Sequence, residues 1–322
     1  MKIVKSVKKI LVTATNYSQL CTEAKALLES NGCQIIENSF GRPMTFDELK
    51  QRVGDVDAVV AGVDTWNAAV YKLAPKLRII SRFGVGVDNI DVEMARRFGI
   101  KVTNAPGKNA NAVAELTIGL LLSAMRSIPS LHQATRQGHW DRFIGDELIG
   151  RKVGMLGFGV IAQKVARKLT GFEVEVAAYD KYPNLEMARQ LKVTIVSADR
   201  VLQESDVVCL LLPSLKETYH FMNKDTFTQM KDGAYFVNTA RGALVDEKAL
   251  CDALRSGKLT AAAIDVYEVE PVSVDNPLFR LKNTVTTPHT AAETYETYRA
   301  VSLHTARAIL DEFEGVSPPQ GL

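Results

Sequence analysis

The sequence predicts an α/β protein with two doubly wound parallel sheets around a cleft. Short apolar runs alternate with helical patterns along the chain, first over residues 10–103 and again over residues 152–287. The second series opens with an apolar strand, a glycine-rich turn and a helix, an order typical of sheets that bind ligands at the carboxyl ends of their strands. A length of 322 residues with 46% hydrophobic content supplies enough core for two such domains.

The first series predicts a flavodoxin-like sheet. Its expected strands are residues 10–13, 34–37, 58–61, 78–81 and 101–103. Thr45 and Glu48 have the spacing of a capping box, which predicts the start of one helix. A second helix near residues 67–73 is expected to stop before Pro75.

The second series predicts a Rossmann-type sheet. Its expected strands are residues 152–156, 174–179, 193–196, 207–212, 234–238, 260–264 and 284–287. Residues 110–126, between the two series, carry apolar side chains on nearly every face, which predicts a helix buried at a domain or subunit junction. The last helical segment, about residues 292–314, has no sheet of its own to pack on, and we expect it to return to the first domain.

These elements predict two domains, one of them discontinuous. Residues 1–105 with 292–322 are expected to form one domain, and residues 106–291 are expected to form the other. The chain would then cross twice between the domains and leave a cleft, and ligands sit in clefts at domain junctions.

The composition favours a cytoplasmic protein with small-molecule ligands. The net charge is +2, with 39 basic and 37 acidic residues, so we expect no partner among nucleic acids or membrane surfaces. Apolar runs are too short for a membrane-spanning helix. The four cysteines are scattered without a CxxC pair, which fits reduced thiols in a cytosol. Histidine, cysteine and carboxylate spacings predict no metal site.

The glycine-rich turn predicts a dinucleotide site. Gly157 and Gly159, with Ala162 in the third position, follow a strand and lead into a helix whose N-terminus can bind a pyrophosphate. Asp180 ends the next strand, about 20 residues later, where a carboxylate binds the ribose hydroxyls of NAD. The carboxylate disfavours the 2′-phosphate of NADP, although Lys181 can offset part of its charge.

Three segments downstream carry side chains suited to acid–base chemistry. Arg241, Glu270 and His289 each follow a predicted strand, and strand ends in a parallel sheet share one edge. An imidazole can take or give the hydroxyl proton, a carboxylate can orient it, and a guanidinium can hold a substrate carboxylate through paired N–H donors. Taken singly, each also has a structural alternative: a surface ion pair, a solvated acidic loop or a histidine in a turn.

The motifs around these residues resemble, in order and spacing, the D-isomer-specific 2-hydroxyacid dehydrogenase family. The matching segments are residues 81–91, 102–109, 157–159, 238–247, 265–271 and 287–289, together with Asp180, and they cover nearly the whole chain. Within the family they look most like phosphoglycerate dehydrogenases in a short form without a regulatory domain, so control by a distant end product is not expected.

The resemblance implies roles for individual residues. Arg241 would anchor the substrate, His289 would be the acid/base with Glu270 as its partner, and Asp265 would contact the nicotinamide carboxamide. Val160 stands where many members carry an arginine, so the pyrophosphate would depend more on backbone N–H groups. The expected cofactor contacts are Gly157, Phe158, Gly159, Val160, Ile161, Asp180, Pro213, Thr239 and Asp265.

Substrate contacts are expected from the first domain. Gly84 and Gly86 allow the N–H groups of Val85 and Gly86 to form an anion-binding nest for the substrate carboxylate, although an ordinary glycine turn is the alternative. Asn104 is either a hinge and substrate contact or merely the end of a strand.

The far end of the substrate is less well specified. Arg82 and Arg142 resemble basic positions that serve the phosphate in phosphoglycerate dehydrogenases, with Arg142 reaching across a dimer, but Ala61 replaces a further arginine. Simple surface charge is the alternative for both arginines. Trp140 lies in the same segment as Arg142, residues 138–142, and is expected to insert into a partner subunit of a homodimer.

Together these features predict an NAD-dependent oxidoreductase that transfers a hydride between nicotinamide and C2 of a small 2-hydroxy or 2-oxo acid. The expected substrate is 3-phosphoglycerate, with a hydroxypyruvate or glyoxylate reductase as the alternative. A binding protein that senses NADH is the alternative from another class.

Overall fold

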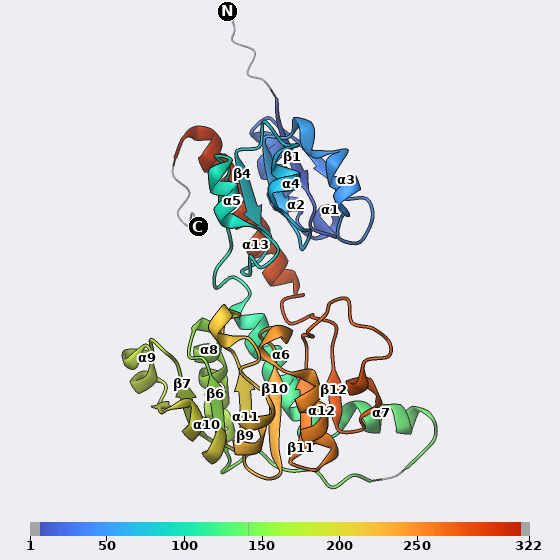
Figure 1. The fold of residues 1–322 in the computed structure, drawn as a ribbon, viewed down its shortest axis with the longest axis vertical. Coiled ribbons are helices and arrows are strands. Elements are labelled where there is room, and N and C mark those ends of the chain that lie inside the picture. Colours follow the sequence, from blue (N-terminus) through green and yellow to red (C-terminus); the bar gives the residue numbers. More distant parts are fainter. Residues whose placement is uncertain (1–6, 141, 317–322) are drawn as a thin grey trace, which may run out of the picture. The chain divides into compact units, whose positions relative to one another are not determined.

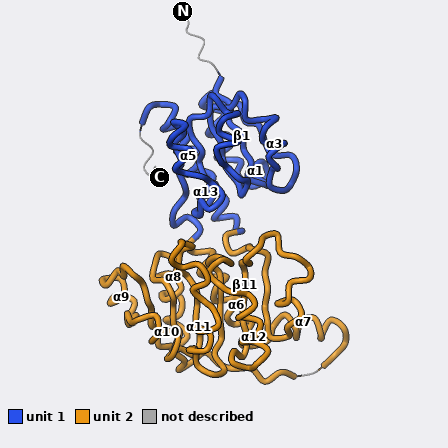
Figure 2. The backbone as a smooth tube through the Cα atoms, in the orientation of Figure 1, with its two compact units in different colours: residues 1–109, 293–322 blue, residues 110–292 orange. Residues whose placement is uncertain are grey.

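The computed structural model describes residues 7–140 and 142–316 of the chain (Figure 1). It divides into two compact units (Figure 2). Unit 1 comprises residues 1–109 and 293–322, and unit 2 comprises residues 110–292. Each unit is built on one parallel sheet, so the predicted α/β class with two doubly wound sheets is confirmed.

Unit 1 contains a five-stranded sheet in the order β2-β1-β3-β4-β5. All of its pairings are parallel, and this order is the doubly wound arrangement of flavodoxin-like sheets. Each strand lies within two residues of its predicted position. The strands are β1 (Lys8–Val12), β2 (Cys33–Glu37), β3 (Ala58–Ala61), β4 (Ile79–Arg82) and β5 (Lys101–Thr103).

Helices pack on this sheet, and the last helix of the chain is one of them. The helices of unit 1 are α1 (Tyr17–Leu20), α2 (Thr22–Ser30), α3 (Phe46–Lys50), α4 (Ala68–Tyr71), α5 (Val92–Arg97) and α13 (Tyr295–Glu314). The capping box of Thr45 and Glu48 is present at the start of α3. Helix α13 packs against α2 and β4, and its buried Glu312 pairs with Arg78 at 2.8 Å. The C-terminal helix thus returns to the sheet formed by the first part of the chain.

Unit 2 contains a seven-stranded sheet in the order β12-β11-β10-β9-β6-β7-β8. Every pairing is parallel, as predicted for a Rossmann-type sheet. The strands are β6 (Lys152–Leu156), β7 (Glu175–Tyr179), β8 (Thr194–Ile195), β9 (Val207–Leu210), β10 (Ala234–Asn238), β11 (Leu259–Ile264) and β12 (Thr284–Thr286). Strand β9 ends two residues earlier than expected, which leaves Leu211 and Leu212 in the loop at the carboxyl edge.

Helices cover both faces of this sheet. The helices of unit 2 are α6 (Ala110–Met125), α7 (Ile128–Arg136), α8 (Val160–Leu169), α9 (Leu185–Gln190), α10 (Ala198–Glu204), α11 (Lys224–Gln229) and α12 (Glu247–Arg255). Helix α6 packs against α8, β10 and β11, and most of its residues are buried, as its apolar sequence predicts. In the described part of the chain, no single helix passes a length and hydropathy test for a membrane span, although α6 and α7, bent by 64°, pass it as a pair.

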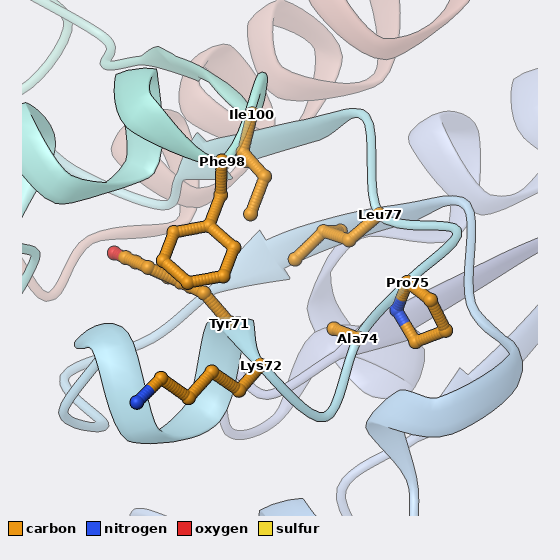
Figure 3. Close-up of a pocket in the computed structure, with 7 residues that line it drawn as sticks. All are labelled: Tyr71, Lys72, Ala74, Pro75, Leu77, Phe98 and Ile100. Carbon is orange, nitrogen blue, oxygen red and sulfur yellow. The ribbon is translucent and has the colours of Figure 1, made fainter.

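One surface pocket of unit 1, about 280 Å³ in volume, is drawn in Figure 3. It is lined by Tyr71, Lys72, Ala74, Pro75, Leu77, Phe98 and Ile100. Leu77 and Ile100 lie just before the residues where β4 and β5 begin, so the pocket lies at the amino edge of the sheet. The Tyr71 hydroxyl donates to the carbonyl oxygen of Trp66 at 3.0 Å, and the remaining lining is mostly apolar. The predicted acid–base residues do not lie in this pocket.

Candidate active site

Arg241, Glu270 and His289 come together at the carboxyl edge of the unit 2 sheet. They follow β10, β11 and β12, which are neighbours in the sheet. Parallel strands place these three loops on one edge, where α/β proteins bind their ligands.

His289 and Glu270 are directly hydrogen-bonded. The distance between His289 Nδ1 and Glu270 Oε2 is 2.6 Å. A carboxylate can only accept, so Nδ1 carries the hydrogen and donates it, which leaves Nε2 as the nitrogen that can exchange a proton with a ligand. The side chains are 44% and 35% exposed, so a small molecule in solution can reach the pair.

The environment of Glu270 keeps it ionised. Burial by itself raises the pKa of Glu270, but hydrogen bonds from His289 and from the Tyr267 N–H, together with the charges of His289 and Arg241, lower the pKa by more. The Tyr267 N–H donates to Oε1 at 3.0 Å, so each carboxylate oxygen accepts a different donor. Glu270 is therefore a negatively charged partner for the imidazole near neutral pH.

Asp265 holds the loop that carries His289. Its side chain is fully buried, and its Oδ1 accepts from the Thr287 hydroxyl at 2.6 Å and from the Thr290 N–H at 2.9 Å. Its Oδ2 accepts from the Ala291 N–H at 3.0 Å, and its carbonyl oxygen accepts from the His289 N–H at 2.7 Å. His289 has a φ of 49°, a left-handed conformation that this set of hydrogen bonds stabilises.

Arg241 and Glu270 lie on loops that pack backbone against backbone. A Cβ atom at Gly242 would be 1.8 Å from the carbonyl carbon of Tyr267, so only glycine permits this approach. Asn238, the last residue of β10, accepts from the Ala240 N–H at 3.0 Å and donates to the Arg241 carbonyl oxygen at 3.1 Å. These contacts fix the Arg241 loop beside the Glu270 loop.

The glycine turn after β6 fits a dinucleotide. Gly157 has a φ of 103°, and a Cβ atom there would be 2.6 Å from the Leu211 carbonyl oxygen, so the turn requires glycine. Gly159 caps the N-terminus of α8, and a Cβ atom there would have no neighbour within 4 Å. The turn therefore leaves its backbone open to a pyrophosphate beside the helix N-terminus. Val160 and Ile161 begin that helix.

Asp180 ties the turn to the end of β7. Its carboxylate accepts from the Phe158 N–H at 2.7 Å and from the Tyr182 N–H at 2.8 Å. The Phe158 side chain is buried in the core, so only its backbone faces the turn. Lys181 Nζ lies 3.0 Å from Glu217 Oε1. Because Lys181 pairs with this second carboxylate, it offsets less of the negative charge of Asp180 than was expected.

Two other expected cofactor residues contact their own unit. Thr239 is buried, and its hydroxyl lies 2.8 Å from the Thr117 hydroxyl on α6. Pro213 follows β9 at the same edge, is exposed, and its carbonyl oxygen accepts from the Thr218 hydroxyl at 2.7 Å.

The residues expected to bind substrate lie in two places. Arg82, Val85, Gly86 and Asn104 gather at the carboxyl ends of β4 and β5 in unit 1, where Asn104 Nδ2 donates to the Val85 carbonyl oxygen at 2.7 Å. Arg142 is exposed on the segment that leads to the amino end of β6, so within one chain unit 2 does not bring it to His289.

Two features of the site were missed from the sequence. One is the support that Asp265 gives to the His289 loop, for which the spacing of the residues offers no signal. The other is a second pair: His220 Nε2 lies 2.5 Å from Glu268 Oε1, and the His220 ring stacks on Tyr219 with centroids 4.0 Å apart. The sequence signal for this second pair was Glu268 itself, a carboxylate two positions before Glu270.

Residues 118–291 match the family described as D-isomer specific 2-hydroxyacid dehydrogenase, NAD binding domain. The chain belongs to this family. The matched region covers nearly all of unit 2, including the glycine turn and the edge with Arg241, Glu270 and His289. NAD is therefore the cofactor of this unit.

Individual relatives extend the similarity over both units. A D-3-phosphoglycerate dehydrogenase from Archaeoglobus fulgidus is 42% identical over 297 residues, 91% of this chain and 56% of that relative, so the chain spans little more than half its length. A glyoxylate reductase from Korarchaeum cryptofilum is 36% identical over 306 residues, 91% of this chain and 92% of that relative. A crystal structure of a protein from Thermus thermophilus has a TM-score of 0.89 at 34% identity, covering 98% of this chain and 99% of its own.

Proposed function

We propose that this member of the family is an NAD-dependent dehydrogenase that interconverts a small D-2-hydroxy acid and its 2-oxo acid. The observation that carries the proposal is the hydrogen-bonded pair of His289 and Glu270, with Arg241 beside it, on the sheet edge that also carries the glycine turn. A pure NADH sensor has no need of an acid–base pair there.

His289 performs the proton transfer in this proposal. In oxidation its Nε2 removes the proton of the substrate hydroxyl, and in reduction it returns a proton to the forming alkoxide. Glu270 holds Nδ1–H, which fixes the tautomer and stabilises the charged ring. NAD, held at the glycine turn and Asp180, would supply the hydride chemistry at C2.

Arg241 and the unit 1 loop bind the substrate in this proposal. The guanidinium holds the substrate carboxylate through paired N–H donors. In unit 1, the N–H groups of Val85 and Gly86 form an anion nest for a substrate carboxylate, and Asn104 supplies a further contact. Accordingly, residues 1–105 with 292–322 form the substrate-binding domain, and residues 106–291 form the NAD-binding domain.

The substrate is either 3-phosphoglycerate or a smaller acid such as hydroxypyruvate or glyoxylate. The 42% identity to a D-3-phosphoglycerate dehydrogenase supports the first. One observation favours the second: Ala61 is fully buried where the family resemblance leads one to expect an arginine, so this position offers no cation to a phosphate. Recognition of a dianion depends on such charge-assisted hydrogen bonds.

Loss of NADH absorbance with a panel of 2-oxo acids tests the function. We expect the protein to reduce at least one of four 2-oxo acids: glyoxylate, hydroxypyruvate, pyruvate and 3-phosphohydroxypyruvate. Where C2 of the product is chiral, the product should have the D configuration. Tight NADH binding without turnover of any of the four would instead support the NADH-sensing alternative. The relative kcat/KM of hydroxypyruvate and its phosphorylated form decides between the two substrate candidates.

We also propose that the protein is a homodimer built through the segment after α7. Ile144 is 96% exposed, Trp140 is 82% exposed and Phe143 is 52% exposed, so three large apolar side chains lie close together in sequence on the surface of one chain. Clustered apolar exposure of this kind is typical of a protein interface. Arg142 lies within the segment and would reach the substrate of the partner subunit.

A further inference from the structure

We propose that Arg82 is a positioning residue that shapes the glycine loop, residues 83–86, and not a ligand for a substrate phosphate. Its guanidinium turns the loop carbonyls inward, which presents the backbone N–H groups of Val85 and Gly86 to the substrate carboxylate. This inference rests on the proposed function for the identity of that anion.

The four consecutive carbonyl oxygens of the glycine loop all accept hydrogen bonds from unit 1. Arg82 supplies two of the donors: its Nε donates to the Gly86 carbonyl oxygen at 2.9 Å and its Nη1 to that of Phe83. The Ala105 N–H donates to the Gly84 carbonyl oxygen at 2.8 Å, and Asn104 Nδ2 donates to that of Val85.

This arrangement determines what the loop can bind. Among the described residues, no backbone carbonyl accepts a hydrogen bond from the N–H of Val85 or of Gly86. Because every carbonyl oxygen of the loop is turned to the protein, the loop offers hydrogen-bond donors and no acceptors. This suits an anion, since no carbonyl oxygen faces its negative charge. A carboxylate with two oxygens matches two adjacent N–H groups.

The guanidinium is enclosed by the loop that it organises. Gly84 has a φ of 149°, and a Cβ atom there would lie 3.1 Å from Arg82 Nη1, so the glycine backbone packs directly on the guanidinium. Arg82 Nη1 also donates to the Ala61 carbonyl oxygen at 3.3 Å, which links the loop to β3.

A buried carboxylate lies within the electrostatic reach of this guanidinium. Asp64 is 2% exposed, and the positive charge of Arg82 partly opposes the rise that burial causes in the pKa of Asp64. Asp64 also accepts from the backbone N–H of Met44.

Paired substrates separate positioning from phosphate binding. Hydroxypyruvate and 3-phosphohydroxypyruvate differ only in the phosphate, and both carry the carboxylate that the glycine loop binds. In Arg82→Gln the KM of both should rise by about 10- to 100-fold with a smaller change in kcat, because the nest is disordered. The ratio of their kcat/KM values should stay within about twofold of the wild-type ratio.

The variant Arg82→Lys sharpens this test. A lysine keeps the positive charge but cannot reproduce the rigid fork that reaches two carbonyl oxygens, so it should behave like Arg82→Gln. Rescue by lysine, or a loss confined to the phosphorylated substrate, would overturn the proposal in favour of phosphate binding. Arg97→Gln, which breaks an exposed ion pair with Glu93 on α5, is the matched control and should leave both KM values unchanged.

Amide hydrogen exchange provides a readout that does not depend on turnover. The Ala105 N–H, which donates to the Gly84 carbonyl oxygen, should exchange at least about tenfold faster in Arg82→Gln and at the wild-type rate in Arg97→Gln. Unchanged exchange at Ala105 would contradict the positioning role. If the wild-type protein reduces neither substrate, the proposed function fails, whereas the exchange experiment still decides the role of Arg82.

Discussion

At the scale of single residues, the two oxygens of Glu270 have separate partners. Oε2 accepts from His289 Nδ1 and Oε1 accepts from the Tyr267 N–H. A glutamine has only one acceptor oxygen, so in Glu270→Gln one of the two N–H donors must face an NH₂ group. We expect kcat to fall by roughly 100-fold or more while the Kd for NADH stays near its wild-type value. Steady-state kinetics with NADH titration measures both, and an unchanged kcat would exclude Glu270 as the partner of His289.

The lowered pKa of Glu270 predicts that the stability of the protein depends on pH. The pKa of Glu270 is lower in the folded protein than its ordinary value of 4.5, so the folded state binds this proton less tightly than the unfolded state. The stabilisation by Glu270 is therefore present above pH 4.5 and is lost as the pH falls through the folded-state pKa. Urea unfolding of wild type and Glu270→Gln should show a stability difference at pH 7 that shrinks in acid. A stability difference that grows in acid would show that folding raises the pKa of Glu270 instead of lowering it.

The residue types of the site could be predicted, but their hydrogen bonds could not. Strand ends and motif spacing placed Arg241, Glu270 and His289 on one edge because that follows from a parallel sheet. The contacts of Arg82 with the carbonyl oxygens of Phe83 and Gly86 depend on how the loop folds back on its own strand. Likewise, nothing in sequence periodicity indicates that the two oxygens of the Asp265 side chain both bind the loop of residues 287–291.

At the scale of elements, Gly242 is the point where the loops that carry Arg241 and Glu270 touch. An added Cβ atom would overlap the Tyr267 carbonyl group, so Gly242→Ala must push the Arg241 and Glu270 loops apart. We expect a loss of roughly 1–3 kcal/mol in the free energy of unfolding together with a large loss of kcat. Urea denaturation and kinetics measure the two effects.

The matched control for that substitution is Gly119→Ala. Gly119 lies within α6, and a Cβ atom there would have no neighbour within 4 Å. Alanine is the better helix former, so this variant should keep its kcat and be as stable as wild type or more stable by up to about 1 kcal/mol. Equal damage from both substitutions would mean that steric contact with Tyr267 is not the cause.

Strands were the most predictable elements because each is a short apolar run in a sheet covered on both faces. Strand β8 (Thr194–Ile195) is shorter than its pattern indicated because it is an edge strand that pairs only with β7. The predicted helix over residues 67–73 is also shorter, since α4 covers only Ala68–Tyr71. Element ends depend on tertiary contacts that periodicity does not contain.

At the scale of the whole molecule, the exposed apolar segment after α7 predicts the oligomeric state. The wild-type chain of 35.4 kDa should sediment as a dimer, because Trp140, Phe143 and Ile144 are more exposed than a monomer surface favours. Ile144→Asp should yield the monomer, since a charge in an apolar interface core is strongly unfavourable. Analytical ultracentrifugation of both proteins decides this, and a wild-type monomer at micromolar concentration would refute the dimer.

The kcat of His289→Ala, measured beside its Kd for NADH, tests most directly the assignment of proton transfer to His289. The ring lies outside the glycine turn, so NADH should bind His289→Ala within about twofold of wild type, while kcat falls by about 100- to 10,000-fold. A kcat close to the wild-type value would contradict the assignment, and parallel losses in kcat and NADH affinity would show that His289 supports the structure of the site instead.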